Sequence, residues 1–219
     1  MKSMKSQQSG FTLVEIAIVL VIIGLLLGGI LKGQELINSA KVKGLAQDFR
    51  NIQTALYGYQ DRYKAIPGDH ATAATAVNGA TTATTPAGTI GNGQINGTWD
   101  SATNTDESRL FWQHVRLAGF MAGPTLVTDP DYTPKNAVGL NMGISSTMQM
   151  TLPAPGMTGT YNICSTGILG KFAKQLDTQL DDGNTLTGSL RVATTATPTT
   201  AIATATVDDA TSYLVCLAF

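Results

Sequence analysis

The sequence predicts an α+β fold in which a long N-terminal helix packs on a small antiparallel sheet that forms a head. Three observations predict it. Residues 11–31 are almost entirely apolar, residues 42–63 carry apolar side chains at helical spacing, and later segments alternate apolar and polar residues between turns. The first half of the helix should span a membrane and the second half should be amphipathic. A chain of 219 residues is long enough for one such head.

The composition limits the classes of function that the chain can have. Charged residues make up 13% of the chain and the formal net charge is -1, so the sequence offers no global basic field to hold nucleic acid. It also contains no G-x-S-x-G, H-E-x-x-H or phosphate-loop motif. Asp69-His70 beside a Pro-Gly turn is the nearest thing to a catalytic pair, and we interpret it as a loop. We therefore expect no enzyme activity; a membrane-tethered enzyme would depend on His70 or His114.

The N-terminus combines a short basic segment with a long apolar one. Residues 1–10 contain Lys2 and Lys5 and no acid, and residues 11–31 carry one charge. As a helix, the apolar segment would extend about 31 Å, which matches the thickness of a bilayer core. The lysines favour a cytoplasmic N-terminus. A secretory signal would place a small-residue cleavage site after the apolar run, but the distinctive junction here is Gly10-Phe11, in front of it.

Glu15 is the one charge within the apolar segment. A carboxylate in a membrane helix is costly and is a functional candidate for that reason. If the chain is cut before Phe11, the new amine lies about one helical turn away. In a bundle of helices, Glu15 of one subunit could pair with the Phe11 amine of its neighbour and set the axial register. The alternative is that Glu15 reaches the lipid headgroups or is protonated.

The segment Gly10-Phe11-Thr12-Leu13-Val14-Glu15, followed by an apolar run, resembles the class III signal of type IV pilins and type II secretion pseudopilins. The resemblance implies cleavage after Gly10 by a prepilin peptidase, N-methylation of Phe11, and pairing of Glu15 with a neighbour's Phe11 amine during assembly. It also implies a membrane platform protein and an assembly ATPase as partners, besides further copies of the chain. The motif covers about the first 35 residues, and the long helix extends the likeness to about residue 65.

The resemblance implies a division of the chain and two possible roles. We expect a cleaved leader at 1–10, a transmembrane or filament-core helix at 11–33, an amphipathic continuation at 34–65 and a globular head at 66–219. Many major pilins and the major pseudopilin carry a proline where this chain has Lys32, so a major and a minor subunit both remain open. The precursor is expected in a bacterial inner membrane as a single-pass protein, and the mature chain in an extracellular pilus or a periplasmic pseudopilus.

The second half of the helix is defined by one apolar stripe. Its members are spaced alternately three and four residues apart, as on one helix face: Val42, Leu45, Phe49, Ile52, Leu56, Tyr59 and Tyr63. The turn at Ile66-Pro67-Gly68-Asp69 ends the helix, which would extend from Phe11 to Ala65. We expect the stripe to pack on the head, and a dimeric coiled coil is the alternative.

The head is predicted to contain short strands and two helices. Residues 71–105 should form a variable surface loop. A helix should follow from Glu107 to Ala118, with His114 packed in its stripe and Gly119 as its cap, and a second helix from Lys171 to Leu180. Alternation predicts strands around Met148, Met150 and Leu152, around Tyr161 and Ile163, and around Leu190 and Val192. A strongly apolar run predicts a last strand from Tyr213 to Phe219.

The two cysteines, Cys164 and Cys216, both lie in predicted strands. They form no C-x-x-C pair and no metal-ligand cluster. In a head that folds outside the cytoplasm they could form a disulfide that ties the last strand to the sheet. Two separate buried thiols are the alternative.

One acidic segment offers hard oxygen ligands. It extends from Asp177 to Asn184, where Asp181, Asp182 and Asn184 surround a glycine turn, as in calcium sites, but the spacing differs from that of an EF-hand loop. We favour a solvated helix-to-strand turn over a calcium site, and expect no cofactor otherwise.

The expected function is therefore structural: a subunit of a type IV pilus-like filament. The alternatives are a pseudopilin of a type II secretion system and a minor or tip pilin that acts as an adhesin.

Overall fold

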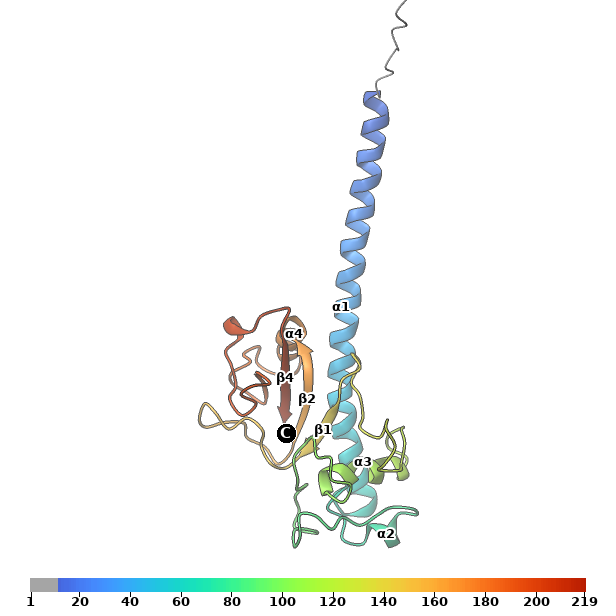
Figure 1. The fold of residues 1–219 in the computed structure, drawn as a ribbon, viewed down its shortest axis with the longest axis vertical. Helices are drawn as coiled ribbons and strands as arrows, with labels where there is room; N and C mark the ends of the chain where they lie inside the picture. The colour runs from blue at the N-terminus through green and yellow to red at the C-terminus, as the bar shows by residue number, and fades with distance from the viewer. Residues whose placement is uncertain (1–11) are drawn as a thin grey trace, which may run out of the picture. The chain divides into compact units, whose positions relative to one another are not determined.

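The computed structural model describes residues 12–219 (Figure 1). The expected leader and the Gly10-Phe11 junction lie outside the described residues. The chain divides into two compact units at Ala40 and Lys41. Helix α1 (Leu13–Tyr63) crosses this boundary without interruption, as expected from the absence of proline before Pro67.

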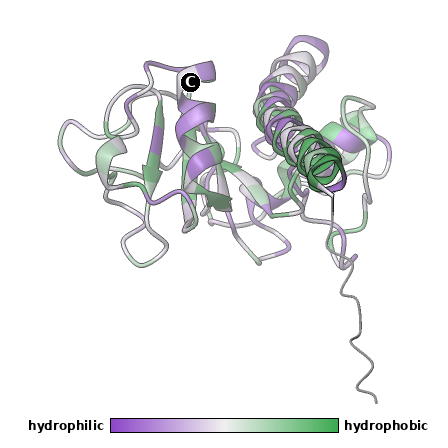
Figure 2. Cartoon of the chain, turned by 90° about the horizontal axis from the view of Figure 1, so that it is seen from above, coloured by the Kyte–Doolittle hydropathy of each residue, from purple (hydrophilic) through white to green (hydrophobic). Residues whose placement is uncertain are grey.

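In the first unit, α1 presents apolar side chains to its surroundings. Large apolar residues from Leu13 to Leu31 are between 46% and 90% exposed, and Figure 2 shows the apolar colouring of this part of the helix. By length and composition, α1 can cross a membrane. Glycines such as Gly24 and Gly28 have no other atom within 4 Å of an added Cβ, so nothing in the single described chain packs on them.

The second unit, residues 41–219, is an α+β head, as predicted. It contains α2 (Ala73–Ala76), α3 (Glu107–Leu117), β1 (Met142–Ser145), β2 (Asn162–Leu169), α4 (Gly170–Leu180), β3 (Leu190–Ala193), a 3-10 turn η1 (Thr204–Thr206) and β4 (Ser212–Ala218). The four strands form one antiparallel sheet in the order β1-β2-β4-β3. The C-terminal strand β4 is therefore central, because β2 and β3 pair with its two edges.

One face of the sheet packs on the second half of α1. Tyr213, Val215 and Leu217 alternate along β4 and share one core with the helix. The helix contributes the predicted stripe, of which Leu45, Phe49, Leu56 and Tyr59 are fully buried. The apolar stripe of the helix and the inward-facing side chains of the strand thus pack together in a single apolar layer.

The opposite face of the sheet holds the cysteines. Cys164 on β2 lies directly across from Cys216 on β4, and the two form a disulfide, which confirms the predicted bridge. A smaller apolar cluster, which includes Met150 and Leu214, surrounds it. The disulfide joins the two central strands, so the C-terminal strand is covalently fixed in the sheet.

Both predicted head helices are present with nearly the expected bounds. Helix α3 ends in a Schellman motif: Gly119 has φ +82° and donates to the Arg116 carbonyl, while Phe120 N–H donates to Val115 O. Gly119 is therefore the predicted cap. The segment 71–105 is mostly irregular and contains only the short α2.

The strand predicted around Met148, Met150 and Leu152 is wrong. This segment forms bends and a single bridge from Leu152 to Thr200, and the edge strand is β1 instead. Met150 is buried in the second core, but Leu152 is 51% exposed. The apparent alternation arises because one residue of this loop, Met150, is buried. Pro153 and Pro155, which follow in the sequence, disfavour a paired strand.

Candidate functional site

The start of α1 is built by Thr12 and Glu15. Glu15 Oε2 accepts hydrogen bonds from the backbone N–H and the hydroxyl of Thr12, both at 2.8 Å. The Thr12 hydroxyl oxygen accepts from the Glu15 N–H at 3.2 Å. This reciprocal arrangement is a capping box, in which the side chains of the cap and the third helical residue satisfy each other's backbone N–H groups.

This capping box was not predicted from the sequence. The sequence does contain the pattern that predicts it, because Thr12-Leu13-Val14-Glu15 has the T-x-x-E form that marks the start of a helix. Glu15 is consequently fixed in position before any neighbour arrives, and it lies exposed on the helix surface. Its carboxylate can cap its own helix and still present charge to another chain.

The surface next to Glu15 is wholly apolar. Val14, Ala17, Ile18, Val21 and Ile22 line a shallow groove of about 300 Å³. An apolar helix surface of this kind is stable in lipid or against other helices, and it is not expected to remain in water. A single carboxylate beside such a groove has few possible partners within a bilayer.

Lys32 follows the apolar segment, at the position where many major pilins have a proline. Its Nζ pairs with Glu35 Oε2 at 2.7 Å, and both side chains are mostly exposed, so the pair contributes little to stability. The two residues lie about one turn apart on an unbroken helix. This end of the apolar segment is therefore polar, and the helix continues through it without a break.

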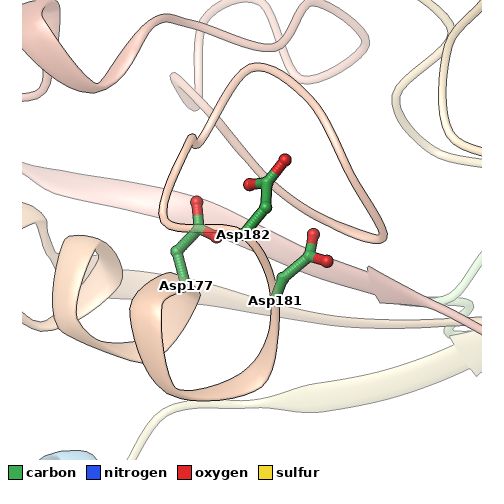
Figure 3. Close-up of side chains that lie close together, drawn as sticks. All are labelled: Asp177, Asp181 and Asp182. Atoms are coloured by element: carbon green, nitrogen blue, oxygen red, sulfur yellow. The ribbon is translucent and has the colours of Figure 1, made fainter.

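A second group of chemically distinctive residues lies in the head, at the end of α4. Asp177, Asp181 and Asp182 each place one carboxylate oxygen within 4.8 Å of the others (Figure 3). Two of the three, Asp181 and Asp182, were ion-site candidates from the sequence. The third candidate, Asn184, uses its side-chain oxygen to accept the Leu186 N–H. Asp177 begins the same segment but was not among its predicted ligands.

Asp177 is fully buried. Its Oδ1 accepts the Gly183 N–H at 3.1 Å, and its Oδ2 has no hydrogen-bond partner among the described residues. Burial raises the pKa of Asp177 to about 7, and the charges of Asp182 and Asp181 act in the same direction. The sequence could not reveal this, because Asp177 occupies an ordinary position in the last turn of a helix.

The two histidines bind loops of the head through their ring nitrogens. The Nδ1 of buried His114 accepts the Gly68 N–H at 2.9 Å, and its Nε2 donates to the Thr81 carbonyl at 2.8 Å. Burial lowers the pKa of His114 to about 4. His70 Nδ1 lies 2.7 Å from the Tyr59 hydroxyl. His114 is therefore a packed histidine, as predicted.

Asp69, the neighbour of His70, is similarly engaged. Its carboxylate accepts backbone N–H groups of Gly91, Asn92 and Gly93. These bonds fix the long loop onto the turn that follows α1. The Asp69-His70 pair is thus part of the loop structure.

Comparison with known protein families identifies one match. Residues 5–31 match the prokaryotic N-terminal methylation motif. The match covers part of the expected leader, residues 5–10, and then Phe11, the capping box and the apolar segment. No curated protein matches the chain.

Proposed function

We propose that this chain, which carries the N-terminal signature of type IV pilins and pseudopilins, is a structural subunit of a type IV pilus-like filament. The observation that carries the proposal is the apolar, exposed first part of α1 with Glu15 at its start. The motif implies processing by a prepilin peptidase and assembly into a filament. A helix of this kind fits a membrane-anchored precursor.

The apolar surface alone cannot set how two such helices meet. Lipid tails are as apolar as leucine, so helices in a bilayer gain little from burying apolar side chains against each other. A charge pair in this low-dielectric setting is strong and directional. We propose that Glu15 of one subunit binds the Phe11 amine that cleavage after Gly10 creates on its neighbour. Leaving either charge unpaired would cost about 3–5 kcal/mol.

The remaining parts of the chain follow from this role. Residues 11–33 would form the filament core, residues 34–65 would connect it to the head, and residues 66–219 would form the outer surface. The partners would be the prepilin peptidase, an inner-membrane platform protein and an assembly ATPase, since the sequence contains no phosphate-loop motif of its own. The precursor would reside in the inner membrane and the mature chain in an extracellular pilus.

A minor subunit, either a minor pilin or a minor pseudopilin, is the second candidate, favoured by Lys32 and the unbroken helix α1. A major pilin and the major pseudopilin would more often carry a proline at this position. The disulfide of the C-terminal strand favours a pilin over a pseudopilin. Abundance separates these roles, because only a major subunit builds long surface fibres by itself.

The test is electron microscopy of sheared surface material from cells that express the wild type, Glu15→Ala or Glu35→Ala. Mass spectrometry identifies the subunit and its first residue. We expect wild-type fibres built of chains that begin at methylated Phe11. Glu15→Ala should abolish them, and Glu35→Ala should not, because Glu35 lies beyond the apolar segment in an exposed pair.

Two results would redirect the proposal. A chain that is cut before Phe11 but builds no fibre would indicate a minor pilin or a pseudopilin. A chain that remains uncut would contradict the filament role in every form.

A further inference from the structure

We propose that a pocket in the head binds a neutral saccharide, with the ring of Trp99 stacked against the sugar. The site goes beyond the proposed filament function and does not depend on it. Its residues all belong to the head, residues 41–219. Three features lead to it: a pocket of suitable size, the tryptophans in its wall, and polar side chains that the fold does not use.

The pocket lies between helix α3, the edge strand β1 and the irregular segment in front of α3. Its volume is about 380 Å³, within the range of about 300–1,000 Å³ that small-molecule sites occupy. A second hollow of about the same volume adjoins it, because Trp99, Asp100 and Thr166 line both. Two adjoining hollows suit a ligand that is built of successive units.

Both tryptophans of the chain line the pocket. Trp112 on α3 is only 3% exposed and belongs to the core of the head. Trp99 is half-buried and lines both hollows, so part of its ring is accessible from them. The face of an indole ring carries partial negative charge and attracts the polarised C–H groups of a sugar ring. Trp99 therefore offers a surface on which a sugar can stack.

The position of Trp99 is fixed before any ligand arrives. The hydroxyl of Ser108 on α3 donates to the Thr98 carbonyl at 2.8 Å, which holds the segment against the helix. At Gly143 on β1, an added Cβ would lie 2.9 Å from a carbon of the Trp99 ring, so glycine allows the ring to approach the strand. A side chain that is held in its binding position loses little conformational entropy when a ligand binds.

Several polar side chains of the lining are not used by the fold. They form no hydrogen bond within the part of the chain that the structure describes, and they come from the loops and from β2: Asp100, Thr133, Asn141 and Thr166. Together they provide carboxylate, hydroxyl and amide groups, which both donate and accept hydrogen bonds. A sugar hydroxyl also donates and accepts, so a polyhydroxylated ligand matches this lining.

The charge of the pocket favours a neutral ligand over an anionic one. Arg109 also lines the pocket, but its Nε donates to Asn104 Oδ1 and its Nη2 to the Val127 carbonyl, both at 2.9 Å. Asp100 is exposed and takes part in none of the ion pairs of the described residues. Its carboxylate would repel a phosphate, sulfate or carboxylate group on a ligand.

A cationic ligand is the alternative, because an ammonium group can bind a tryptophan face beside a carboxylate. Recognition of this kind relies on aromatic faces around the cation, whereas Trp112 is almost completely buried. The uncharged hydroxyl and amide groups of Thr133, Asn141 and Thr166 would also contribute little to a cation without hydrogen-bond donors. The lining therefore favours a saccharide.

The test begins with binding of the full chain to an array of immobilised neutral, sialylated and sulfated glycans, in a detergent without a sugar headgroup. The neutral oligosaccharide with the strongest signal is then titrated by calorimetry, and tetramethylammonium is titrated as the cationic probe. In the wild type, tryptophan fluorescence reports whether the oligosaccharide reaches the pocket, because both tryptophans line it.

Two pocket variants each have a matched control. Trp99→Ala removes the stacking ring, and Tyr57→Ala removes a ring that is 53% exposed on α1, outside the pocket. Asp100→Asn removes the carboxylate of the pocket, and Asp61→Asn removes an exposed carboxylate of α1.

The wild type should bind neutral glycans in preference to the anionic ones, with a change in tryptophan emission. Trp99→Ala should bind the oligosaccharide roughly tenfold more weakly and Asp100→Asn roughly fivefold more weakly, whereas both controls should bind like the wild type. If Trp99→Ala fails to fold, Asp100→Asn and Asn141→Ala provide the comparison, because both positions are exposed. The absence of glycan binding, a preference for anionic glycans, binding of tetramethylammonium alone, or equal affinities in pocket variants and controls would overturn the saccharide site.

Discussion

Buried His114 makes the stability of the head depend on pH. It is held as the neutral imidazole, because its Nδ1 accepts the Gly68 N–H and its Nε2 donates to the Thr81 carbonyl. Protonation would remove the acceptor for Gly68. His70, whose ring centroid lies 6.5 Å from that of His114, and the Tyr59 ring at 6.0 Å are the groups that face it. None of these neighbours is an acid that would stabilise an imidazolium.

Acidification should therefore weaken the head. The pKa of His114 is lowered to about 4 in the folded protein, against 6.5 in the unfolded chain. The unfolded chain binds the proton more tightly, so this stabilisation is complete above pH 6.5 and is lost as the pH falls towards 4. Between pH 7 and pH 4.5 the contribution of His114 to the unfolding free energy should decrease by about 2 kcal/mol.

Denaturant unfolding at the two pH values measures this effect, with His114→Gln as the comparison. Burial gives Asp177 a raised pKa and hence the opposite pH dependence, but that contribution is common to both proteins and cancels in the difference. The pH dependence should be smaller in His114→Gln than in the wild type. Equal pH dependence in the two proteins would show that His114 does not titrate with unfolding.

At the scale of elements, the sequence predicted what depends on local pattern and missed what depends on distant contacts. The stripe of α1 followed from its helical periodicity, and the strand around Val215 from its run of apolar residues. The edge strand β1 could not be predicted in this way, because its four residues include Gly143 and show no clear alternation of apolar and polar side chains. An added Cβ there would lie 1.8 Å from the Trp99 carbonyl oxygen, so a loop far away in sequence determines that glycine.

The same distinction applies to the candidate sites. Glu15 could be singled out because a lone acid in an apolar helix is conspicuous in the sequence. Asp177 could not, because only its burial and the unpartnered Oδ2 distinguish it from a solvated helical aspartate. Tertiary packing supplies both features.

The first turn of α1 allows the two roles of Glu15 to be separated. Thr12→Ala removes the capping hydroxyl but keeps the charge, at a cost of about 1 kcal/mol in helix stability. Glu15→Gln keeps a side chain that can complete a capping box but removes the charge. If the charge drives assembly, Thr12→Ala should still form fibres and Glu15→Gln should not.

Electron microscopy of sheared material, with immunoblots of total chain as the control for expression, measures both variants. The opposite pattern, with fibres in Glu15→Gln and none in Thr12→Ala, would assign Glu15 to helix capping alone. Loss in both variants at normal expression would mean that the cap and the charge are required together, which is contrary to the expected independence.

At the scale of the whole molecule, the two units use apolar residues for different purposes. In the described part of the first unit, residues 12–40, no side chain is buried. In the second unit, the core begins at Val42 and includes both the second half of α1 and the sheet. The head therefore contains all the contacts that its fold requires, and the disulfide between β2 and β4 lies within it.

A chain shortened to residues 41–219 should accordingly fold by itself. We expect it to be soluble without detergent, because the exposed apolar segment has been removed. Its melting temperature by tryptophan fluorescence should match that of the head in the full chain to within about 3 °C, the shift expected from less than 1 kcal/mol. Starting the chain at Ile52 instead is the matched control: it removes Val42, Leu45 and Phe49 from the core and should abolish cooperative unfolding. Aggregation or loss of cooperative melting in the 41–219 chain would mean that the head depends on the preceding helix. Anchoring and folding would then be inseparable in this molecule.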